Sequence, residues 1–311
     1  MATPNQRFSP RRQLGKTGFQ ATALGIGDIA DRRIEATTLV ATLHRAMDAG
    51  LNVIDTAPNY EAGYSEEIVG QTLKSRRDGM FLISKIDHFD QPIAPQVEGS
   101  LKRLQTDRTD AFVFHGMSSV EKWNEAAKPG GLMEQLGEAV KAGKTCFRGI
   151  SSHDPDTLVA ALNSGLCDIV MFAIGPYVHD RYVTEILPLT KKLKVATVCF
   201  KTFGAGKLLA DTSGYNQPLQ DRPRGKVSSG GGGEQVNVLP RLAVDECLHY
   251  TMTVDPDVAL LGMSFPNEQD AAFAAARAFK PLAADRMADI KRRAVDAIAQ
   301  KGNVWWNPGG K

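Results

Sequence analysis

Eight short apolar runs alternate with longer amphipathic segments along this chain, and that regularity constrains its fold more than any other feature. A short apolar run bounded by turn residues is typical of a buried strand, and the segments between the runs have helical periodicity. Strands that alternate with helices in this way form parallel sheets with right-handed crossovers. We predict strands at residues 21–27, 52–56, 80–86, 110–115, 145–151, 168–174, 195–200 and 257–262.

Eight strand and helix repeats predict closure into a (β/α)8 TIM barrel, an α/β fold that forms one domain. The length of 311 residues suits one such barrel, so we expect a single domain over residues 1–311. An open doubly wound sheet is the alternative, but it normally carries a G-x-G-x-x-G turn after its first strand. The first strand here ends in LGIGDI, in which no third glycine follows in register. The helices predicted between the strands include 37–49, 65–75, 95–104, 132–142, 156–163 and 181–193.

Two regions interrupt the alternation. Residues 205–237 are rich in Gly, Ser, Pro and charged residues, and a loop of this length inside a compact domain is either functional or disordered. Residues 267–311 form a C-terminal tail that is alanine-rich and helical in period over 271–299, with Pro281 separating two helices. We expect Trp305 and Trp306 near its end to pack against the barrel, with a substrate lid as the alternative.

The charge and the cysteine content argue against several functional classes. A formal net charge of +2, with scattered basic residues, gives no electrostatic reason to expect nucleic acid or an anionic membrane as a partner. The four cysteines lie far apart without a C-x-x-C pair, which favours reduced thiols over disulfides or a metal site. The first residues lack the apolar run of a signal peptide, and no later stretch is long enough for a membrane span. We therefore expect a cytoplasmic protein of undetermined oligomeric state.

Four residues of different chemistry lie at or just beyond the ends of consecutive apolar runs, namely Asp55, Tyr60, Lys85 and His115. A parallel barrel brings the carboxyl ends of its strands onto one rim, so these side chains can meet in one pocket. One reaction open to such a set of residues is the reduction of a carbonyl, which needs a proton at the carbonyl oxygen. Nothing in the chain suggests a metal that would polarise this oxygen, so a side chain would have to supply the proton. The phenol of Tyr60 is a weak acid unless a cation such as Lys85 lowers its pKa, and Asp55 can supply that lysine with a counter-charge. His115 can orient the substrate oxygen or assist the proton transfer.

The segment 52–66, NVIDTAPNYEAGYSE, resembles the active-site signature of the aldo-keto reductases. The resemblance continues through Lys85, His115 and the segments GISSH at 149–153 and KTFGAG at 201–206, and it runs from about residue 14 to about residue 276. It implies a barrel enzyme that transfers a hydride between a nicotinamide cofactor and a carbonyl or alcohol. It also implies Tyr60 as the general acid/base. Lys85 and Asp55 would tune that phenol, and His115 would orient the substrate.

The resemblance further implies where the nicotinamide ring lies. Ser151 and Ser152 occupy positions where the family usually has Ser-Asn holding the carboxamide. Met171 stands where a Gln commonly makes the next contact, and a methionine cannot supply that hydrogen bond. Phe200 lies where an aromatic ring often stacks on the nicotinamide, with a place in the core as the alternative.

Two later segments resemble the sites for the rest of the dinucleotide. The first offers backbone N–H groups and lysine charge to a pyrophosphate, through Lys201, Phe203, Gly204, Gly206 and Lys207. The second resembles the adenosine-binding segment, through Gly262, Ser264, Glu268 and Gln269. The family often has an arginine near position 268 for the 2′-phosphate of NADPH, which the charge of Glu268 would repel. We expect NADP(H) on the resemblance alone, with NAD(H) as the alternative.

Two other functions stay open beside reduction of a small-molecule carbonyl. The changed carboxamide contacts at Ser152 and Met171 fit a second hypothesis, in which a tightly held nicotinamide cofactor serves another reaction. A sugar or natural-product oxidation, or an elimination, would be of this kind. The third hypothesis is a cofactor-sensing binding protein that resembles the potassium-channel β subunits.

Overall fold

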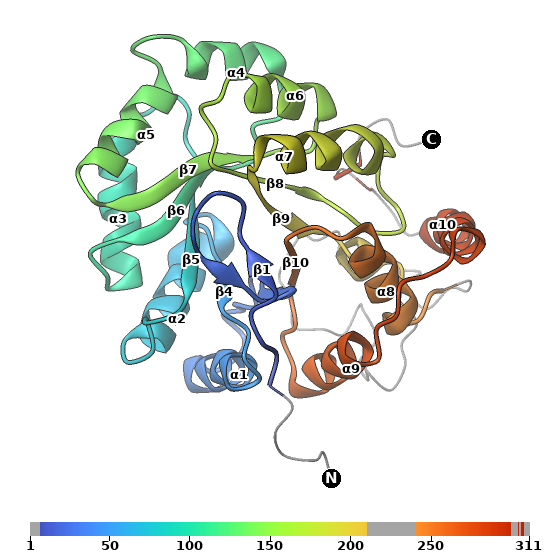
Figure 1. Cartoon of the computed structure of the whole chain (residues 1–311). Helices are drawn as coiled ribbons and strands as arrows, with labels where there is room; N and C mark the ends of the chain where they lie inside the picture. The colour runs from blue at the N-terminus through green and yellow to red at the C-terminus, as the bar shows by residue number, and fades with distance from the viewer. Residues whose placement is uncertain (1–6, 210–240, 300–303, 305, 308–311) are drawn as a thin grey trace.

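The computed structural model describes residues 7–209, 241–299, 304, 306 and 307 of the chain. Eight parallel strands close into a barrel, and helices surround it (Figure 1). The predicted TIM barrel is confirmed and the open doubly wound sheet is excluded. In the order in which they pair around the barrel, the strands are β3 (Leu24–Ile26), β4 (Val53–Asp55), β5 (Phe81–Ile86), β6 (Thr109–Phe114), β7 (Thr145–Ser151), β8 (Ile169–Ala173), β9 (Ala196–Phe200) and β10 (Val258–Leu261).

Amphipathic helices form the outer ring of the barrel (Figure 1). Five of the six helices predicted between the strands match the structure within two residues at each end. None of the described helices combines the length and the apolar character needed to cross a bilayer. The helices are α1 (Ala36–Asp48), α2 (Tyr64–Leu73), α3 (Ile93–Leu104), α4 (Val120–Ala127), α5 (Leu132–Lys141), α6 (Pro155–Asn163), α7 (Leu187–Leu193), α8 (Val244–Val254), α9 (Pro266–Arg277) and α10 (Ala284–Ile298).

The helix predicted at 181–193 is not one regular helix. Its first part, η2 (Tyr182–Ile186), is a turn of π-helix, and α7 follows it directly. Pro188 stands in the first turn of α7, and a proline has no N–H for the hydrogen bond to a preceding carbonyl. We attribute the wider turn ahead of α7 to this missing donor.

The first predicted strand, 21–27, is wrong at its amino end. Gln20 and Ala21 instead form β2 (Gln20–Ala21), which pairs in antiparallel fashion with β1 (Arg12–Gln13) in a hairpin across the base of the barrel (Figure 1). Thr22 redirects the chain between β2 and β3, because its N–H donates to Asn52 Oδ1 at 2.9 Å and its hydroxyl to the carbonyl of Leu24 at 2.7 Å. Apolar alternation continues through this corner, so the sequence pattern alone does not reveal it.

The core has an inner part, inside the barrel, and an outer part, between strands and helices. Along β8, Ile169 and Met171 belong to the inner cluster, whereas Val170 and Phe172 belong to the outer one. The strands are close together where Gly149 of β7 faces Ile169, because a Cβ at Gly149 would lie 1.7 Å from the Ile169 carbonyl oxygen. The four cysteines are all free, and only Cys146 is exposed.

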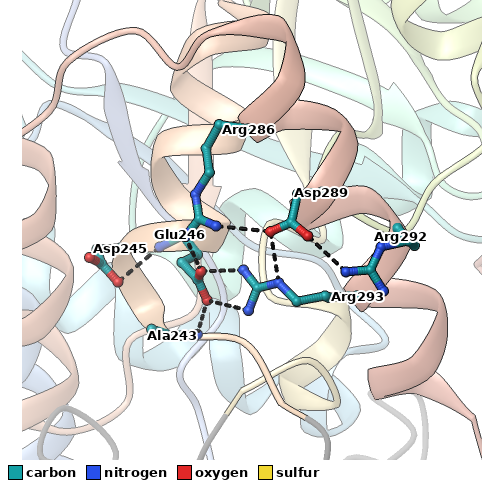
Figure 2. A network of polar contacts seen from close by, with 7 residues as sticks. All are labelled: Ala243, Asp245, Glu246, Arg286, Asp289, Arg292 and Arg293. Atoms are coloured by element: carbon teal, nitrogen blue, oxygen red, sulfur yellow. Dashed lines mark hydrogen bonds and ion pairs between the residues drawn. The ribbon is translucent and has the colours of Figure 1, made fainter.

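The two C-terminal helices divided at Pro281 are confirmed, and the second ends within one residue of the predicted 299. Helix α9 starts at Pro266, ahead of the predicted 271, and α10 follows after the break at Pro281. Ion pairs hold α10 against α8, and Figure 2 shows Glu246 of α8 accepting from both Arg286 and Arg293 of α10. Trp305 and most of the predicted loop at 205–237 lie outside the described residues. That the whole chain forms one domain stays a prediction.

Candidate active site

The barrel brings the four residues of the predicted constellation to one sector of its carboxyl-terminal rim. Asp55 is the last residue of β4, Lys85 is the fifth of the six residues of β5, and His115 directly follows β6. Tyr60 begins η1 (Tyr60–Gly63), a single 3-10 turn between β4 and α2. Three neighbouring strands of the sheet therefore supply the set.

Asp55 and Lys85 form a buried ion pair. The Lys85 ammonium donates to both carboxylate oxygens of Asp55 at 2.7 Å and to the carbonyl of Thr56 at 2.8 Å, so all three of its protons have acceptors. The side chains of Asp55 and Lys85 are only 3% and 2% exposed. Burial lowers the pKa of Lys85, but the charges and hydrogen bonds of Asp55 and Tyr60 raise it further, so the net shift is upward. The lysine is thus a fixed positive charge at neutral pH.

Tyr60 lies against both Lys85 and His115. The Lys85 Nζ is 4.6 Å from the centroid of the Tyr60 ring. The rings of Tyr60 and His115 meet edge to face, with centroids 5.4 Å apart and planes at 84°. The phenol ring of Tyr60 therefore lies in contact with both the ammonium of Lys85 and the imidazole of His115.

The pKa of Tyr60 contradicts the expectation that a neighbouring cation makes this phenol a stronger acid. Burial raises the pKa of Tyr60, and the ammonium of Lys85 lowers it. The carboxylates of Asp55 and Asp28 raise it again, and the net shift is upward. Lys85 acts in the expected direction, but desolvation outweighs one ammonium whose charge is already paired. The phenol is consequently protonated at neutral pH.

The turn that carries Tyr60 has an unusual backbone. Glu61 and Ala62 have φ angles of 50° and 53°, and Gly63 follows at 89°. A left-handed conformation costs a residue with a side chain about 1 to 2 kcal/mol. Arg32 offsets part of this cost, because its guanidinium donates twice to the carbonyl of Glu61, at 2.8 and 3.1 Å. The position of Tyr60 is therefore fixed by surrounding contacts.

The buried carboxylate of Glu66 supports the Tyr60 turn through Arg103. Glu66 in α2 is fully buried, and it accepts from the Ser84 hydroxyl and from Nε of Arg103, both at 2.6 Å. Arg103 also packs on Gly63, where a Cβ would lie 2.8 Å from the Cδ of Arg103. The sequence analysis did not single out Glu66, although it lies inside the signature segment 52–66.

Two more carboxylates that the sequence analysis missed border the constellation. Asp87, which follows Lys85 by two residues, accepts from His115 Nδ1 at 2.5 Å. Asp28 follows β3, and its carboxylate accepts from the Ser65 hydroxyl at 2.9 Å. The available signal was position, since Asp87 directly follows β5 and Asp28 follows β3 after one glycine, so both reach the same rim.

The residues predicted to contact the nicotinamide belong to or directly follow three neighbouring strands, β7, β8 and β9. Ser151 and Ser152 end and follow β7, and both are buried. Their hydroxyls have partners within the protein, since Ser151 accepts from the N–H of Gly116 at 2.9 Å and Ser152 from that of Asp154 at 3.1 Å. Met171 is fully buried in the inner core, and Phe200 at the end of β9 is half-buried.

The segment 201–207 differs from the predicted anion cradle. It is strongly turned, with Lys201, Gly204 and Gly206 at φ angles of 74°, 53° and 86°. Three of the backbone N–H groups predicted to face a pyrophosphate have partners inside the segment, and the cofactor role of the segment stays a prediction. The amides of Gly204, Gly206 and Lys207 all donate to carbonyls within the segment, at 2.8 to 3.0 Å. Phe203, also predicted to bind cofactor, supplies one of those carbonyls and is buried.

Two ammonium groups give this sector a positive charge. Lys201 and Lys207 lie with their Nζ atoms 5.4 and 5.6 Å from the ring of Trp306, which is fully buried. The carbonyl of Trp306 lies 3.2 Å from Nδ1 of His153. Burial and the charge of Lys201 lower the pKa of His153 to about 4, so this imidazole is neutral at pH 7. The expectation that Trp306 packs against the barrel is confirmed, and it does so at the rim.

The predicted adenosine segment is engaged mainly in structural contacts. Glu268 is buried and accepts from the N–H of Ser264 at 2.7 Å at the start of α9. Gln269 donates to the carbonyl of Thr42 in α1 at 2.8 Å, so the structure turns this side chain toward α1. Gly262 directly follows β10 at the rim.

The charges around the rim suit an anionic dinucleotide bound beside a proton-transfer site. Acidic groups follow β3 to β5, whereas Lys201 and Lys207 follow β9. The half-buried ring of Phe200, at the end of β9, lies beside the lysine sector, 6.0 Å from Nζ of Lys201 and 5.2 Å from the ring of His153. The donor set thus fits a ligand that carries phosphate charge at one end and a flat ring at the other.

Comparison with known proteins places this arrangement in a family. Residues 21–292, which contain every barrel strand, match the model of the Aldo/keto reductase family. The chain belongs to that family. The match leaves out most of the base hairpin and the segment around Trp306.

Individual relatives are distant. "Aldo-keto reductase YhdN" of Bacillus subtilis is 30% identical over 217 residues, which are 63% of this chain and 62% of YhdN. "Methylglyoxal reductase YeaE" of Escherichia coli is 32% identical over 143 residues, 45% of this chain and 48% of YeaE. The chain thus matches less than two thirds of the length of these relatives. A solved aldo-keto reductase of Klebsiella pneumoniae in complex with NADPH has a TM-score of 0.65 at 22% identity, with 90% of this chain and 93% of that chain covered.

Proposed function

We propose that this aldo/keto reductase is an NAD(P)H-dependent oxidoreductase that reduces a small carbonyl compound, or oxidises the corresponding alcohol, with Tyr60 as the general acid/base. The observation that carries the proposal is the buried ion pair of Lys85 and Asp55 lying directly beside the Tyr60 phenol, with His115 at its edge. A buried charge pair is costly to maintain, and its place beside a phenol in a rim pocket gives it a function there.

Each of the four residues has one role in the reaction. Tyr60 gives its proton to the carbonyl oxygen in reduction and takes it back in oxidation. A nicotinamide cofactor would supply, when bound, the hydride for the carbonyl carbon, so that one proton and one hydride balance the reaction. Lys85 stabilises the phenolate that remains on Tyr60, and Asp55 holds Lys85 in its charged form. His115 orients the substrate oxygen.

The raised pKa of Tyr60 is compatible with this role. An acid must carry its proton before the reaction, and burial ensures that the phenol does so at neutral pH. The Lys85 charge then acts when negative charge appears on the phenolate, which makes it an interaction that strengthens in the transition state. Lys85 therefore contributes more to the reaction rate than the pKa of Tyr60 before the reaction suggests.

Lys201, Lys207 and Phe200 are the residues that would hold the cofactor. The two ammonium groups would pair with its phosphates, and the aromatic ring would face the nicotinamide. We propose NADP(H) as the preferred cofactor, supported by the Klebsiella pneumoniae structure that contains NADPH. NAD(H) stays the alternative because Glu268 stands at the position where the family often has an arginine for the 2′-phosphate.

The direct test of the acid is Tyr60→Phe. We expect kcat for reduction of methylglyoxal, the substrate named in the YeaE relative, to fall by about 10² to 10⁴. Cofactor affinity should stay within about twofold, because the substitution removes one hydroxyl. Tyr64→Phe is the matched control, since it removes a phenol four residues away whose ring packs under Arg32. Retained turnover in Tyr60→Phe would rule out the proposed acid.

Cofactor binding can be followed by tryptophan fluorescence. Trp306 is buried against Lys201 and Lys207, so a dinucleotide that engages these lysines should change its emission. We expect titration with NADPH to saturate at lower concentration than titration with NADH. Trp306→Phe should abolish most of the signal while calorimetry still detects binding. Equal affinity for the two cofactors would contradict the NADP(H) preference.

A second candidate function rests on Met171. The methionine stands where an amide side chain is expected to bind the carboxamide, and the methionine side chain is buried in the inner core. The cofactor would then be held mainly by its phosphates and serve another reaction without exchanging. Protein purified without added cofactor would show the absorption band of reduced nicotinamide if this candidate is right. Multiple turnovers with added NADPH would instead favour the exchanging reductase over both this candidate and a cofactor-sensing binding protein.

A further inference from the structure

The carboxylate of Asp87 joins two parts of the proposed catalytic set. Its Oδ1 lies 2.5 Å from Nδ1 of His115, and its Oδ2 accepts from the backbone N–H of Asn59 at 2.8 Å. Asn59 directly precedes Tyr60 in the chain. The Asp87 side chain is 8% exposed, and its bond to His115 is partly buried, whereas its bond to Asn59 lies at the surface. One buried carboxylate therefore touches both the segment that leads into the phenol and the imidazole.

The bond to Asp87 determines which nitrogen of His115 carries a proton. An ionised carboxylate only accepts hydrogen bonds, so Nδ1 must be the donor in this contact. The other nitrogen, Nε2, is then the one left for a substrate. In the neutral ring Nε2 is an acceptor, which suits the hydroxyl of an alcohol, and a second proton on Nε2 makes it a donor to a carbonyl oxygen. Carboxylates that fix a histidine in this way are common beside metal and catalytic sites.

We propose that Asp87 is a positioning residue of the active site, which holds His115 as the Nδ1–H tautomer and fixes the imidazole relative to the Tyr60 turn. This inference builds on the proposed oxidoreductase function. With Nδ1 of His115 bonded to Asp87, the Nε2 atom is the one that meets the substrate in both directions of the reaction.

The bond to Asn59 extends the argument to Tyr60. The turn after Tyr60 contains the left-handed residues Glu61 and Ala62, so the backbone there is held by contacts outside the turn. Asp87 supplies one such contact on the amino side of Tyr60. The edge-to-face arrangement of Tyr60 and His115, at 5.4 Å and 84°, is then set by a single group that touches both segments.

Asp87→Asn separates the two roles of this carboxylate. The amide retains an oxygen that can accept from Asn59, but its NH₂ group can also donate to Nδ1 of His115 and so stabilise the opposite tautomer. We expect kcat to fall by about 10- to 100-fold, the usual cost of losing a partner that orients a functional histidine. The KM for the carbonyl substrate should change less than kcat, and the affinity for NADPH should stay within about twofold. Asp90→Asn is the matched control, because it removes an exposed carboxylate from the same loop.

Nitrogen-15 NMR of the imidazole supplies a readout that a merely structural role would not change. His115 is assigned by comparison with His115→Gln, and we expect the Nδ1–H tautomer in the natural protein and in Asp87→Glu. Asp87→Asn should shift the ring toward the Nε2–H tautomer. In the His115→Gln background, Asp87→Asn should have little further effect on kcat, because the aspartate acts through the histidine.

The outcomes are decisive in both directions. An unchanged tautomer in Asp87→Asn, or a kcat within about twofold of the natural protein, would reduce Asp87 to a backbone contact and overturn the inference. A loss of rate that persists in full in the His115→Gln background would do the same. The NMR measurement needs no turnover, so a protein that reduces no carbonyl would refute the proposed function while the tautomer result still decides the role of Asp87.

Discussion

The ion pair of Glu66 and Arg103 behind the Tyr60 turn should contribute strongly to stability. The two side chains meet at 2.6 Å, and Glu66 is fully buried whereas Arg103 is 32% exposed. At this distance the Coulomb energy is about 6 kcal/mol for an effective dielectric constant of about 20. Desolvation consumes much of it, and breaking a buried pair typically costs about 3 to 5 kcal/mol. Because the guanidinium keeps a third of its exposure, we expect a coupling energy of about 2 kcal/mol.

A double-mutant cycle measures this coupling. The variants are Glu66→Gln, which keeps the shape and the bond to Ser84, Arg103→Met, and the two together. Urea unfolding followed by circular dichroism gives the free energy of unfolding of each. The exposed pair of Glu138 and Lys141, at 2.7 Å, is the matched control, and we expect no measurable coupling there. A coupling in the pair of Glu66 and Arg103 that does not exceed the control would refute the reasoning that burial makes this pair strong.

The remaining predictions concern the effect of pH on the folded state and the effect of adding a methyl group at two glycines. Burial raises the pKa of Glu246, but the bonds from Arg293 and a backbone N–H lower it more, so it lies below its ordinary value of 4.5. A lowered carboxyl pKa stabilises the folded state above pH 4.5 and loses this effect as the pH falls below it. The protection of the α10 amides, which is their exchange rate relative to the intrinsic rate at the same pH, should therefore fall there, and Glu246→Gln should flatten the change. In Gly149→Ala the new Cβ would lie 1.7 Å from the Ile169 carbonyl oxygen, so we expect a loss of at least about 3 kcal/mol of stability or no soluble protein. Gly99→Ala in α3, where only the Arg103 side chain is within reach at 3.5 Å, should instead raise the melting temperature, through a gain of about 0.5 to 1 kcal/mol.

The sequence predicts the barrel well because its signal is repeated eight times. Seven of the eight predicted strands match within one residue at each end, since each is a run of buried apolar residues with turn residues beside it. The first strand fails at Thr22, where a hydroxyl and the Asn52 side chain turn the chain without any change in hydrophobicity. Helices α4 and α8 were not among those predicted. Local pattern therefore specifies the elements, while side-chain hydrogen bonds decide where an element stops.

The candidate site was predictable only as far as residue type and strand ends allow. The gathering of Tyr60, Lys85 and His115 on one rim follows from parallel topology alone. Asp87 and Glu66 were missed because their importance depends on partners 28 and 37 residues away in the chain, which no local pattern shows. The predicted direction of the pKa shift of Tyr60 was wrong. Desolvation raises this pKa, and desolvation depends on how the rim is packed, which the sequence does not show.

The hairpin across the base closes one end of the barrel. Leu14 is fully buried in the inner core, and the neighbouring Gly15 is pressed against the backbone of Ala196, where a Cβ would lie 2.3 Å from the amide nitrogen. Phe19 adds a ring contact with Phe81 at 5.2 Å. Side chains also fill the interior of the barrel, so a ligand reaches Tyr60 from the carboxyl-terminal rim and not through the barrel. Where one ligand covers another at that rim, the covered ligand has to bind first and leave last, which makes the order of binding a property of the architecture.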